Sequence, residues 1–312
     1  MIALKKWFKK TKETSGGNGL FASLEELIAM RRYVPYLKGF NQLKTFSKQA
    51  GDIKSAFKGR GMELEEIRSY TFGDDVRDID WRVTARKDSP YTKLYAEEKD
   101  REIYVWLDLS APMRFGTRRE LKSVAAAKLA ALLGWMSLEN KDRFGCVIFD
   151  GSESLVFKPN NSRAQLMAVL KKIADMSKAV LEAKNNHQPH YVRSFQQLER
   201  TVKNQATVFI LSDFSGFDDG MKRQLASLAK KTRLYLFDIF DVLEEVAPKA
   251  GEYMAEYGGK RLIFDSGAKA YREDYQNYFA EKRQKLKNFC GQFGCQLSEI
   301  RTDTEFAKKI KI

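Results

Sequence analysis

The sequence predicts an α/β fold in which a largely parallel sheet carries helices on both faces. From about residue 103 onward, short apolar runs typical of strands alternate with longer patterns typical of helices. The run Ile103–Leu107 is apolar throughout, which is typical of a central strand that is buried on both faces of a parallel sheet. Because most of these strands are followed by a helix that can cross back over the sheet, we expect successive strands to be parallel.

The expected elements form one sheet with a short hairpin arm, which follows the turn at Gly151 and Ser152. Ser23 is the expected N-cap of the first helix, with Glu26 at the capping-box position. Strands are predicted at Ile103–Leu107, Arg143–Phe149, Ser154–Phe157, Thr207–Leu211, Arg233–Ile239, Leu262–Phe264 and Gln296–Ile300. Helices are predicted at Leu24–Met30, at Arg118–Leu138, from the cap Ser162 to Met176, from near Ser194, at Asp218–Lys230, at Arg272–Phe293, and from Thr302 or Asp303 to the end.

The distribution of charge divides the chain ahead of the α/β region. The formal net charge is +14, and residues 1–60 hold thirteen Lys or Arg against four Asp or Glu, a net of +9. Residues 63–80 reverse the sign, with seven acids against two arginines. We therefore expect three parts: a flexible basic tail at 1–22, an N-terminal segment with an acidic block at 23–100, and the α/β domain at 101–312.

Composition also bounds the class of protein. No stretch approaches the roughly 20 consecutive apolar residues of a membrane-spanning helix, and the N-terminus lacks the pattern of a secretory signal. Three scattered cysteines form neither a disulfide framework nor a paired zinc motif, so reduced thiols are expected. A globular cytoplasmic protein is the resulting expectation.

The acidic block Gly73–Arg82 contains four aspartates, two arginines and Trp81. Such a density of carboxylates is compatible with a bound divalent cation, an ion-pair network or an acidic surface for a partner. We favour the ion-pair network, which would join the N-terminal segment to the sheet domain with Trp81 packed beneath it. The expected pairs connect Asp74, Asp75, Asp78 and Asp80 with Arg68, Arg77, Arg82 and backbone amides.

A second group of polar residues follows the predicted strands. Asp108 and Asp213 each come directly after or close to the end of a strand, and Ser110 lies two residues beyond Asp108. In an open parallel sheet, ligands bind beyond the carboxyl ends of the strands. Oxygen ligands from separate loops, completed by water, are what Mg²⁺ requires.

The run Asp108-Leu109-Ser110-Ala111-Pro112 resembles the D-x-S-x-S start of the metal-ion-dependent adhesion site of von Willebrand factor A domains. More specifically, the chain resembles the bacterial family known as domain of unknown function 58 over about residues 25–312. The segments that carry this resemblance are Gly61–Tyr70, Gly73–Arg82, Ala85-Arg86, Glu97–Arg101, Phe237-Asp238 and Asp265. It implies a von Willebrand factor A-type, Rossmann-like sheet domain.

The resemblance also implies a set of metal ligands. Asp108 and Ser110 match the first two positions, Ser194 stands near the expected threonine, and Asp213 matches the last acidic position. Pro112 departs from the pattern, because it offers no side-chain oxygen where a serine is expected. The implied ion is Mg²⁺, which would keep one coordination position open for a carboxylate supplied by a partner.

Members of this family are typically encoded beside AAA+ ATPases of the MoxR group. The resemblance therefore implies a non-enzymatic partner or adaptor for such an ATPase in protein assembly, maturation or metal insertion. The sequence contains no G-x-x-x-x-G-K-[ST] loop. Its only histidines, His187 and His190, are expected to lie in a polar loop rather than in a catalytic triad or a zinc site.

Other classes stay open at this stage. A nucleic-acid-binding protein would use the Lys-rich N-terminus to hold phosphates. A metal-dependent nuclease would use the same basic N-terminus together with Asp80, Glu97 and Lys99, which imitate the acid, Glu-x-Lys pattern of such enzymes. A peripheral membrane protein would instead insert Trp7, Phe8 and their apolar neighbours among the lysines of the tail.

Overall fold

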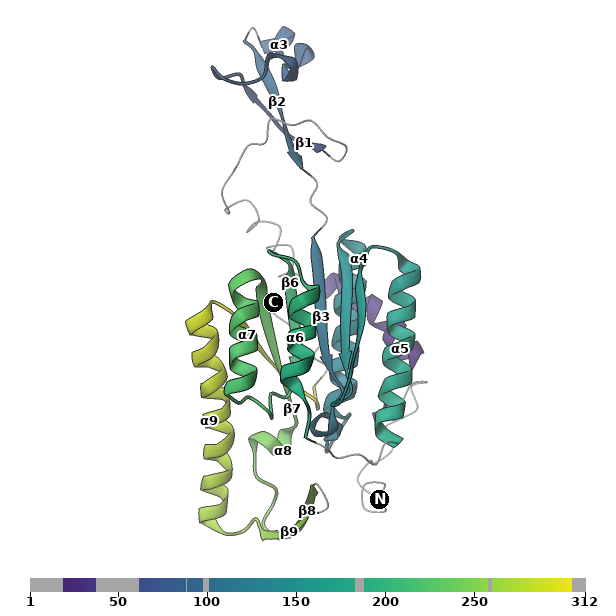
Figure 1. Ribbon diagram of the computed structural model, residues 1–312, viewed down its shortest axis with the longest axis vertical. Coiled ribbons are helices and arrows are strands. Elements are labelled where there is room, and N and C mark those ends of the chain that lie inside the picture. The colour runs from purple at the N-terminus through teal and green to yellow at the C-terminus, as the bar shows by residue number, and fades with distance from the viewer. Residues whose placement is uncertain are drawn as a thin grey trace. The chain divides into compact units, whose positions relative to one another are not determined.

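The computed structural model describes residues 19–37, 62–87, 89–97, 101–182, 188–257 and 260–304 (Figure 1). The chain divides into two compact units: residues 19–37 group with residues 101–304, and residues 62–97 belong to the other unit. Several predictions concern residues outside the described ranges, namely Trp7 and Phe8, Glu98 and Lys99, His187 and the body of the closing helix.

The larger unit is built on a six-stranded sheet with the order β10-β7-β6-β3-β4-β5. Every neighbouring pair is parallel except β4 and β5, which form the antiparallel hairpin arm at one edge. The predicted α/β fold with a largely parallel sheet is confirmed. The strands are β3 (Glu102–Asp108), β4 (Arg143–Phe149), β5 (Ser154–Asn160), β6 (Thr207–Ser212), β7 (Arg233–Phe240) and β10 (Gln296–Arg301).

The strand order changes direction between β3 and β6. The chain leaves β3 for β4 on one side and later returns to place β6 on the other side of β3. Loops that leave two such strands diverge toward opposite faces of the sheet, so a crevice forms beyond their carboxyl ends. Asp108 ends β3 and Ser212 ends β6, which places both residues at this crevice.

Helices cover both faces of this sheet (Figure 1). The side chains of α6, α7 and α9 pack in one apolar cluster with one face of the strands, including Trp106 and Ile210. No helix among the described residues is long and apolar enough to cross a membrane. The helices of this unit are α1 (Leu24–Ala29), α4 (Lys122–Glu139), α5 (Arg163–Glu182), α6 (Tyr191–Thr201), α7 (Asp219–Lys231), α8 (Val242–Glu245) and α9 (Lys269–Phe293), with the 3₁₀ helices η2 (Met30–Tyr36) and η5 (Ala111–Arg114).

Helix α4 is buried on nearly all sides because α1 and η2 cover the face that points away from the sheet. The Trp135 indole of α4 donates a hydrogen bond to the Leu27 carbonyl of α1 at 3.1 Å. Gly19, with φ of +72°, packs so closely that an added Cβ would lie 2.3 Å from the Arg119 carbonyl. The expected boundary between a tail at 1–22 and a segment at 23–100 therefore differs from the observed one, because Gly19 to Leu37 belongs with the sheet.

Helix α1 begins as predicted. Ser23 accepts a hydrogen bond from the Glu26 amide, and Glu26 accepts one from the Ser23 amide, which completes the capping box. Helix α4 begins four residues later than predicted. Thr117 is held by Asp241 through both its amide and its hydroxyl, so the residues after it stay in a loop until Lys122.

The smaller unit is an antiparallel pair, β1 (Met62–Ser69) and β2 (Tyr91–Glu97), joined through η4 (Val76–Asp78) and α3 (Trp81–Lys87). Its acidic block forms local bonds: Asp74 pairs with Arg68 at 2.7 Å, and Asp80 caps α3 by accepting from the amides of Arg82 and Val83. These partners lie in the same unit rather than in the sheet domain. Trp81 is 67% exposed, so the expectation that it packs beneath the block is wrong.

A small antiparallel hairpin follows α8. It pairs β8 (Glu252–Tyr257) with β9 (Lys260–Asp265) and ends where Ser266 donates to the carbonyls of Lys249 and Gly251. The sequence predicted only the second arm, at Leu262–Phe264, and missed β8, because Glu252–Tyr257 does not show the period-two alternation that indicates a half-buried strand.

Candidate functional site at the carboxyl ends of the strands

Asp108 lies at the end of the central strand β3 and is completely buried. One carboxylate oxygen accepts a hydrogen bond from the Ser110 amide at 2.9 Å, and the other accepts one from the Ser212 hydroxyl at 2.7 Å. Burial, and then the nearby charge of Asp213, raise the pKa of Asp108 from 3.8 to about 6. Ionisation of Asp108 therefore requires more free energy in the folded protein than in water.

Ser110 turns its hydroxyl toward α6. Its oxygen lies 3.2 Å from the Tyr191 hydroxyl, and both side chains are buried. The Tyr191 ring fits because Gly216 has no side chain: an added Cβ would lie 2.4 Å from the ring. Burial, followed by Asp108 and Asp213, raises the pKa of Tyr191, so this phenol stays neutral and is available as a donor.

Ser194 lies in α6 and does not join Asp108 and Ser110. Its hydroxyl accepts a hydrogen bond from the Trp106 indole at 2.8 Å and lies 2.5 Å from the Ser154 hydroxyl. These contacts connect α6 with β3 and the β5 edge. The structure thus places Ser194 within a structural network on one face of the sheet.

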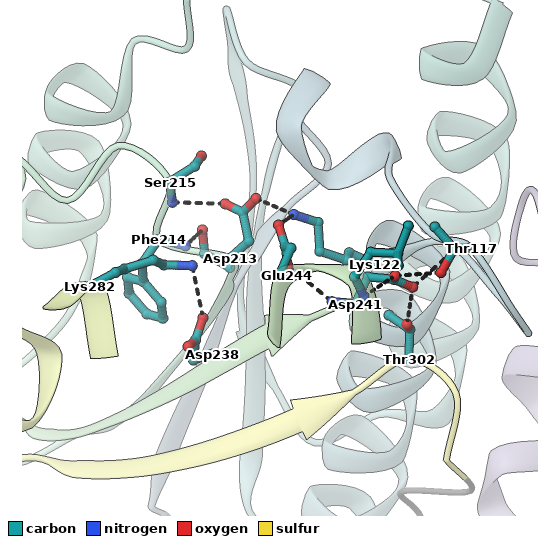
Figure 2. Close-up of polar contacts among 12 residues, drawn as sticks. Thr117, Lys122, Asp213, Phe214, Ser215, Asp238, Asp241, Glu244, Lys282 and Thr302 are labelled. Atoms are coloured by element: carbon teal, nitrogen blue, oxygen red, sulfur yellow. Dashed lines mark hydrogen bonds and ion pairs between the residues drawn. The ribbon is translucent and has the colours of Figure 1, made fainter. Parts of the chain in front are cut away.

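Asp213 follows β6 and is bound to a buried lysine (Figure 2). One oxygen accepts from the Lys122 ammonium at 2.6 Å, and the other accepts from the Ser215 amide at 2.9 Å. The same ammonium donates to Glu244 of α8 at 2.7 Å. Burial by itself would raise the pKa of Asp213, but Lys122 and then Lys282 bring it below its usual value.

Lys122 itself is only 2% exposed. Burial would lower the pKa of this ammonium, but Asp213 and then Glu244 outweigh that effect and raise the pKa. Lys122 is therefore charged at every physiological pH. It is the first residue of α4, where the positive end of the helix dipole disfavours a cation, so the two carboxylates must supply the compensation.

Asp241 fixes three loops at this end of the sheet (Figure 2). It follows β7 and accepts from the Thr117 amide and hydroxyl, from the Thr302 hydroxyl at 2.9 Å, and from the Leu243 amide at 2.9 Å. Asp241 is fully buried and also forms a capping box with Glu244. The loops after β3, β7 and β10 are therefore held by a single carboxylate.

A second buried ion pair lies one strand further along. Asp238 of β7 is 1% exposed and lies 3.5 Å from the Lys282 ammonium of α9. Burial raises the pKa of Asp238 to about 6, although Lys282 acts in the opposite direction. This pair adds a second lysine to the acids that line the same edge.

The loop between Asp213 and α7 is strained at Phe214. This residue has φ of +49°, in a region that bulky side chains rarely adopt, and is buried. The Ser212 hydroxyl accepts from the Phe214 amide at 3.1 Å, which helps to hold the conformation. Strain of this kind persists only where the surroundings determine it.

The ligands that the resemblance implies for Mg²⁺ are Asp108, Ser110, Ser194 and Asp213. Both oxygens of Asp108 and both oxygens of Asp213 already have partners within the protein, and Ser194 bonds to Trp106. A permanent ammonium touches Asp213, and a divalent ion on the same carboxylate would be repelled by it. Within the described residues, no group of three or more Asp, Glu, His or Cys could hold a metal. The residues do not fit the ion in this arrangement.

Sequence reasoning missed Lys122, Tyr191 and Asp241. A signal existed for Asp241, since it follows a strand by the same rule that indicated Asp108 and Asp213. A weaker signal existed for Lys122, because a lysine at the first position of a helix opposes the dipole. No sequence signal indicated Tyr191, because its position depends on the close approach of its ring to Gly216.

We expect Asp108→Asn to stabilise the protein at pH 7.5. The folded pKa of Asp108 is raised from 3.8 to about 6, so its contribution to stability is fully present below pH 3.8 and is lost as pH rises to 6. Removing the charge should add about 1–2 kcal/mol to the free energy of unfolding at pH 7.5 and reduce its slope between pH 4 and 6. Urea unfolding at several pH values measures both quantities. A variant that is less stable than wild type at pH 7.5 would show that the charge of Asp108 is needed.

Comparison with known proteins gives a family and several distant relatives. The family described as "Protein of unknown function DUF58" matches residues 66–285. Uncharacterized proteins of Mycobacterium bovis and of Mycobacterium tuberculosis are each 26% identical over 261 residues, which is 83% of this chain and 81% of the relative. The likeness spans both units of the chain.

Solved structures show more distant likenesses. The conserved hypothetical protein BatB from Bacteroides thetaiotaomicron has a TM-score of 0.38 and 13% identity, covering 67% of this chain and 94% of BatB. An aerotolerance-related membrane protein from Bacteroides fragilis has a TM-score of 0.39 and 12% identity, with the same shares covered. A von Willebrand factor type A protein from Catenulispora acidiphila has a TM-score of 0.29 and 13% identity, covering 59% of this chain and 42% of its own.

Proposed function

We propose that this chain, which belongs to the DUF58 family, is a non-enzymatic cytoplasmic interaction protein that works with a MoxR-type AAA+ ATPase in protein assembly or maturation. The proposed contact surface is the edge formed by the carboxyl ends of the six-stranded sheet. The observation that carries the proposal is that the buried acids of this edge bond to groups of the protein itself. Such bonds shape loops, whereas a catalytic group must reach a substrate.

The loops at this edge are pre-organised. Asp241 holds the loops after β3, β7 and β10 together, and Lys122 connects the start of α4 with Asp213 and Glu244. A surface whose loops are already ordered loses less conformational entropy when a partner binds. A rigid edge therefore supports a role in recognition.

The same edge presents exposed side chains around the buried network. Phe115 in the loop after β3 is 42% exposed, and Val246 after α8 is 54% exposed. The Arg118 side chain, also in the loop after β3, is 63% exposed and pairs with Asp303 at 3.4 Å. Aromatic residues and arginine are the types most often found at the centre of protein interfaces.

We expect Arg118→Glu to weaken binding to the MoxR-type ATPase of the same genome by about tenfold or more, because an exposed cation at the interface becomes an anion. The matched control is Lys203→Glu at the opposite end of the sheet. Lys203 is 70% exposed and pairs with Glu102 at 2.9 Å, so the two variants replace similar surface ion pairs. Biolayer interferometry with the immobilised ATPase measures both affinities.

The two variants separate the possible outcomes. Loss of binding in Arg118→Glu with normal binding in Lys203→Glu supports the proposed surface. Equal binding by both variants contradicts that surface. No binding by the wild-type chain, with or without nucleotide, contradicts the partnership itself.

A further inference from the structure

The position of Lys122 is unusual for a lysine. Its side chain is almost fully buried, and it projects from the first turn of α4 toward the loops that follow β6 and β7. The Phe115 ring lies 5.8 Å from its ammonium. A buried ammonium is retained only where other groups compensate for the loss of water around it.

Two carboxylates provide that compensation, and they come from different loops. Asp213 follows β6 and approaches the ammonium to 2.6 Å, while Glu244 lies in α8 beyond β7 and approaches it to 2.7 Å. In a parallel sheet, a divalent cation is bound by oxygens that come from separate strand-end loops and converge on its charge. Here the positive charge belongs to a side chain.

We propose that the Lys122 ammonium takes the place of a divalent cation at this edge of the sheet, so that the site is ordered without a metal ion. The ammonium is covalently attached and cannot dissociate. A metal ion that approached Asp213 would have to share its carboxylate with this ammonium and would be repelled.

The neighbouring pair supports this assignment. Asp238 and Asp213 are both buried, and the Lys282 ammonium lies 3.5 Å from Asp238. A lysine of α4 thus pairs with the buried acid that follows β6, and a lysine of α9 pairs with the buried acid of β7. A buried aspartate is therefore paired with a lysine at two positions along this edge of the sheet.

The isolated chain contains every residue of this site, so no partner is needed to test it. We expect calorimetric titration of the wild-type protein with Mn²⁺ or Mg²⁺, after treatment with EDTA, to give no saturable binding at this site. We also expect the same melting temperature in EDTA and in millimolar Mg²⁺. Saturable binding that is lost in Asp213→Asn would overturn the proposal.

Removing the lysine should create the metal site. In Lys122→Ala, Asp213 and Glu244 face the space that the ammonium occupied, and Mn²⁺ is expected to bind there. At 100 times its dissociation constant, the ion should raise the folding equilibrium constant about 100-fold. Should the variant unfold in EDTA, recovery of its circular dichroism spectrum upon addition of Mn²⁺ gives the same readout.

The control is Lys122→Ala combined with Asp213→Asn, which removes one of the two carboxylates and should abolish the response to Mn²⁺. If Lys122→Ala shows no response to Mn²⁺, either as a folded protein or on refolding, the position is not equivalent to a cation site and the proposal fails. Because no ATPase takes part, this result is independent of the proposed partnership.

Discussion

Replacing Lys122 by methionine is expected to lower the free energy of unfolding by about 3–5 kcal/mol, the usual cost of breaking a buried ion pair. Methionine fills a similar volume but leaves Asp213 buried without its ammonium partner. The loss should be largest at neutral pH and smaller in acid, because without its ammonium partner the buried Asp213 of the variant takes up a proton more readily than in the wild-type protein. Urea unfolding at pH 7.5 and pH 4 measures the difference.

The control for this variant is Lys203→Met. Lys203 is 70% exposed and pairs with Glu102 at the amino end of β3, so its loss should cost less than about 1 kcal/mol. A double variant with Lys122→Met and Asp213→Asn should recover part of the stability, since it removes the uncompensated charge. Equal small losses in Lys122→Met and Lys203→Met would contradict the role assigned to the buried ammonium.

The second large effect is expected for Asp241→Ala. This change leaves four donors without their acceptor: the Thr117 amide and hydroxyl, the Thr302 hydroxyl and the Leu243 amide. We expect the free energy of unfolding to fall by about 3–5 kcal/mol, because unsatisfied buried donors cost about 1–3 kcal/mol each and part of the strain can relax. Hydrogen exchange should also show faster opening of the loops after β3 and β10.

Asp218→Ala is the matched control for Asp241→Ala. Asp218 is also an N-cap aspartate, but within the part of the chain that the structure describes its side chain accepts a hydrogen bond only from the Met221 amide of α7, at 2.8 Å. Loss of a single cap costs about 1 kcal/mol. If both variants lose the same stability, Asp241 acts as a simple helix cap and does not hold the three loops.

Much of the sheet domain could be predicted from the sequence because its strands are buried on both faces. β4 begins and ends at the predicted residues, and β3 and β6 extend the predicted runs by one or two residues. Continuous apolar runs leave little ambiguity in such strands. The capping box of α1 could also be predicted, because its two residues are only three positions apart in the sequence.

The parts that could not be predicted depend on contacts between distant residues. Lys122 and Glu244 are 122 residues apart, and Thr117 and Asp241 are 124 residues apart. No local pattern indicates which buried lysine will meet which acid. For the same reason the start of α4 was placed too early, since the loop before it is held by Asp241 rather than by a local cap.

The candidate site illustrates the same limit. Sequence reasoning located Asp108, Ser110 and Asp213 at the carboxyl ends of strands, and the structure places them there. The chemistry that was expected at that location, a magnesium ion, depended on the absence of another cation. The presence of Lys122 beside Asp213 becomes visible only when α4 is packed on the sheet.

The most direct test of an internal cation is nuclear magnetic resonance of the protein labelled with ¹⁵N-lysine. At pH 7 we predict an ammonium resonance that is protected from exchange with water, disappears in Lys122→Met, and keeps its intensity when Mn²⁺ is added. A Lys122 resonance that is broadened by stoichiometric Mn²⁺ would place a metal ion at the carboxylates of Asp213 and Glu244, and would contradict the account.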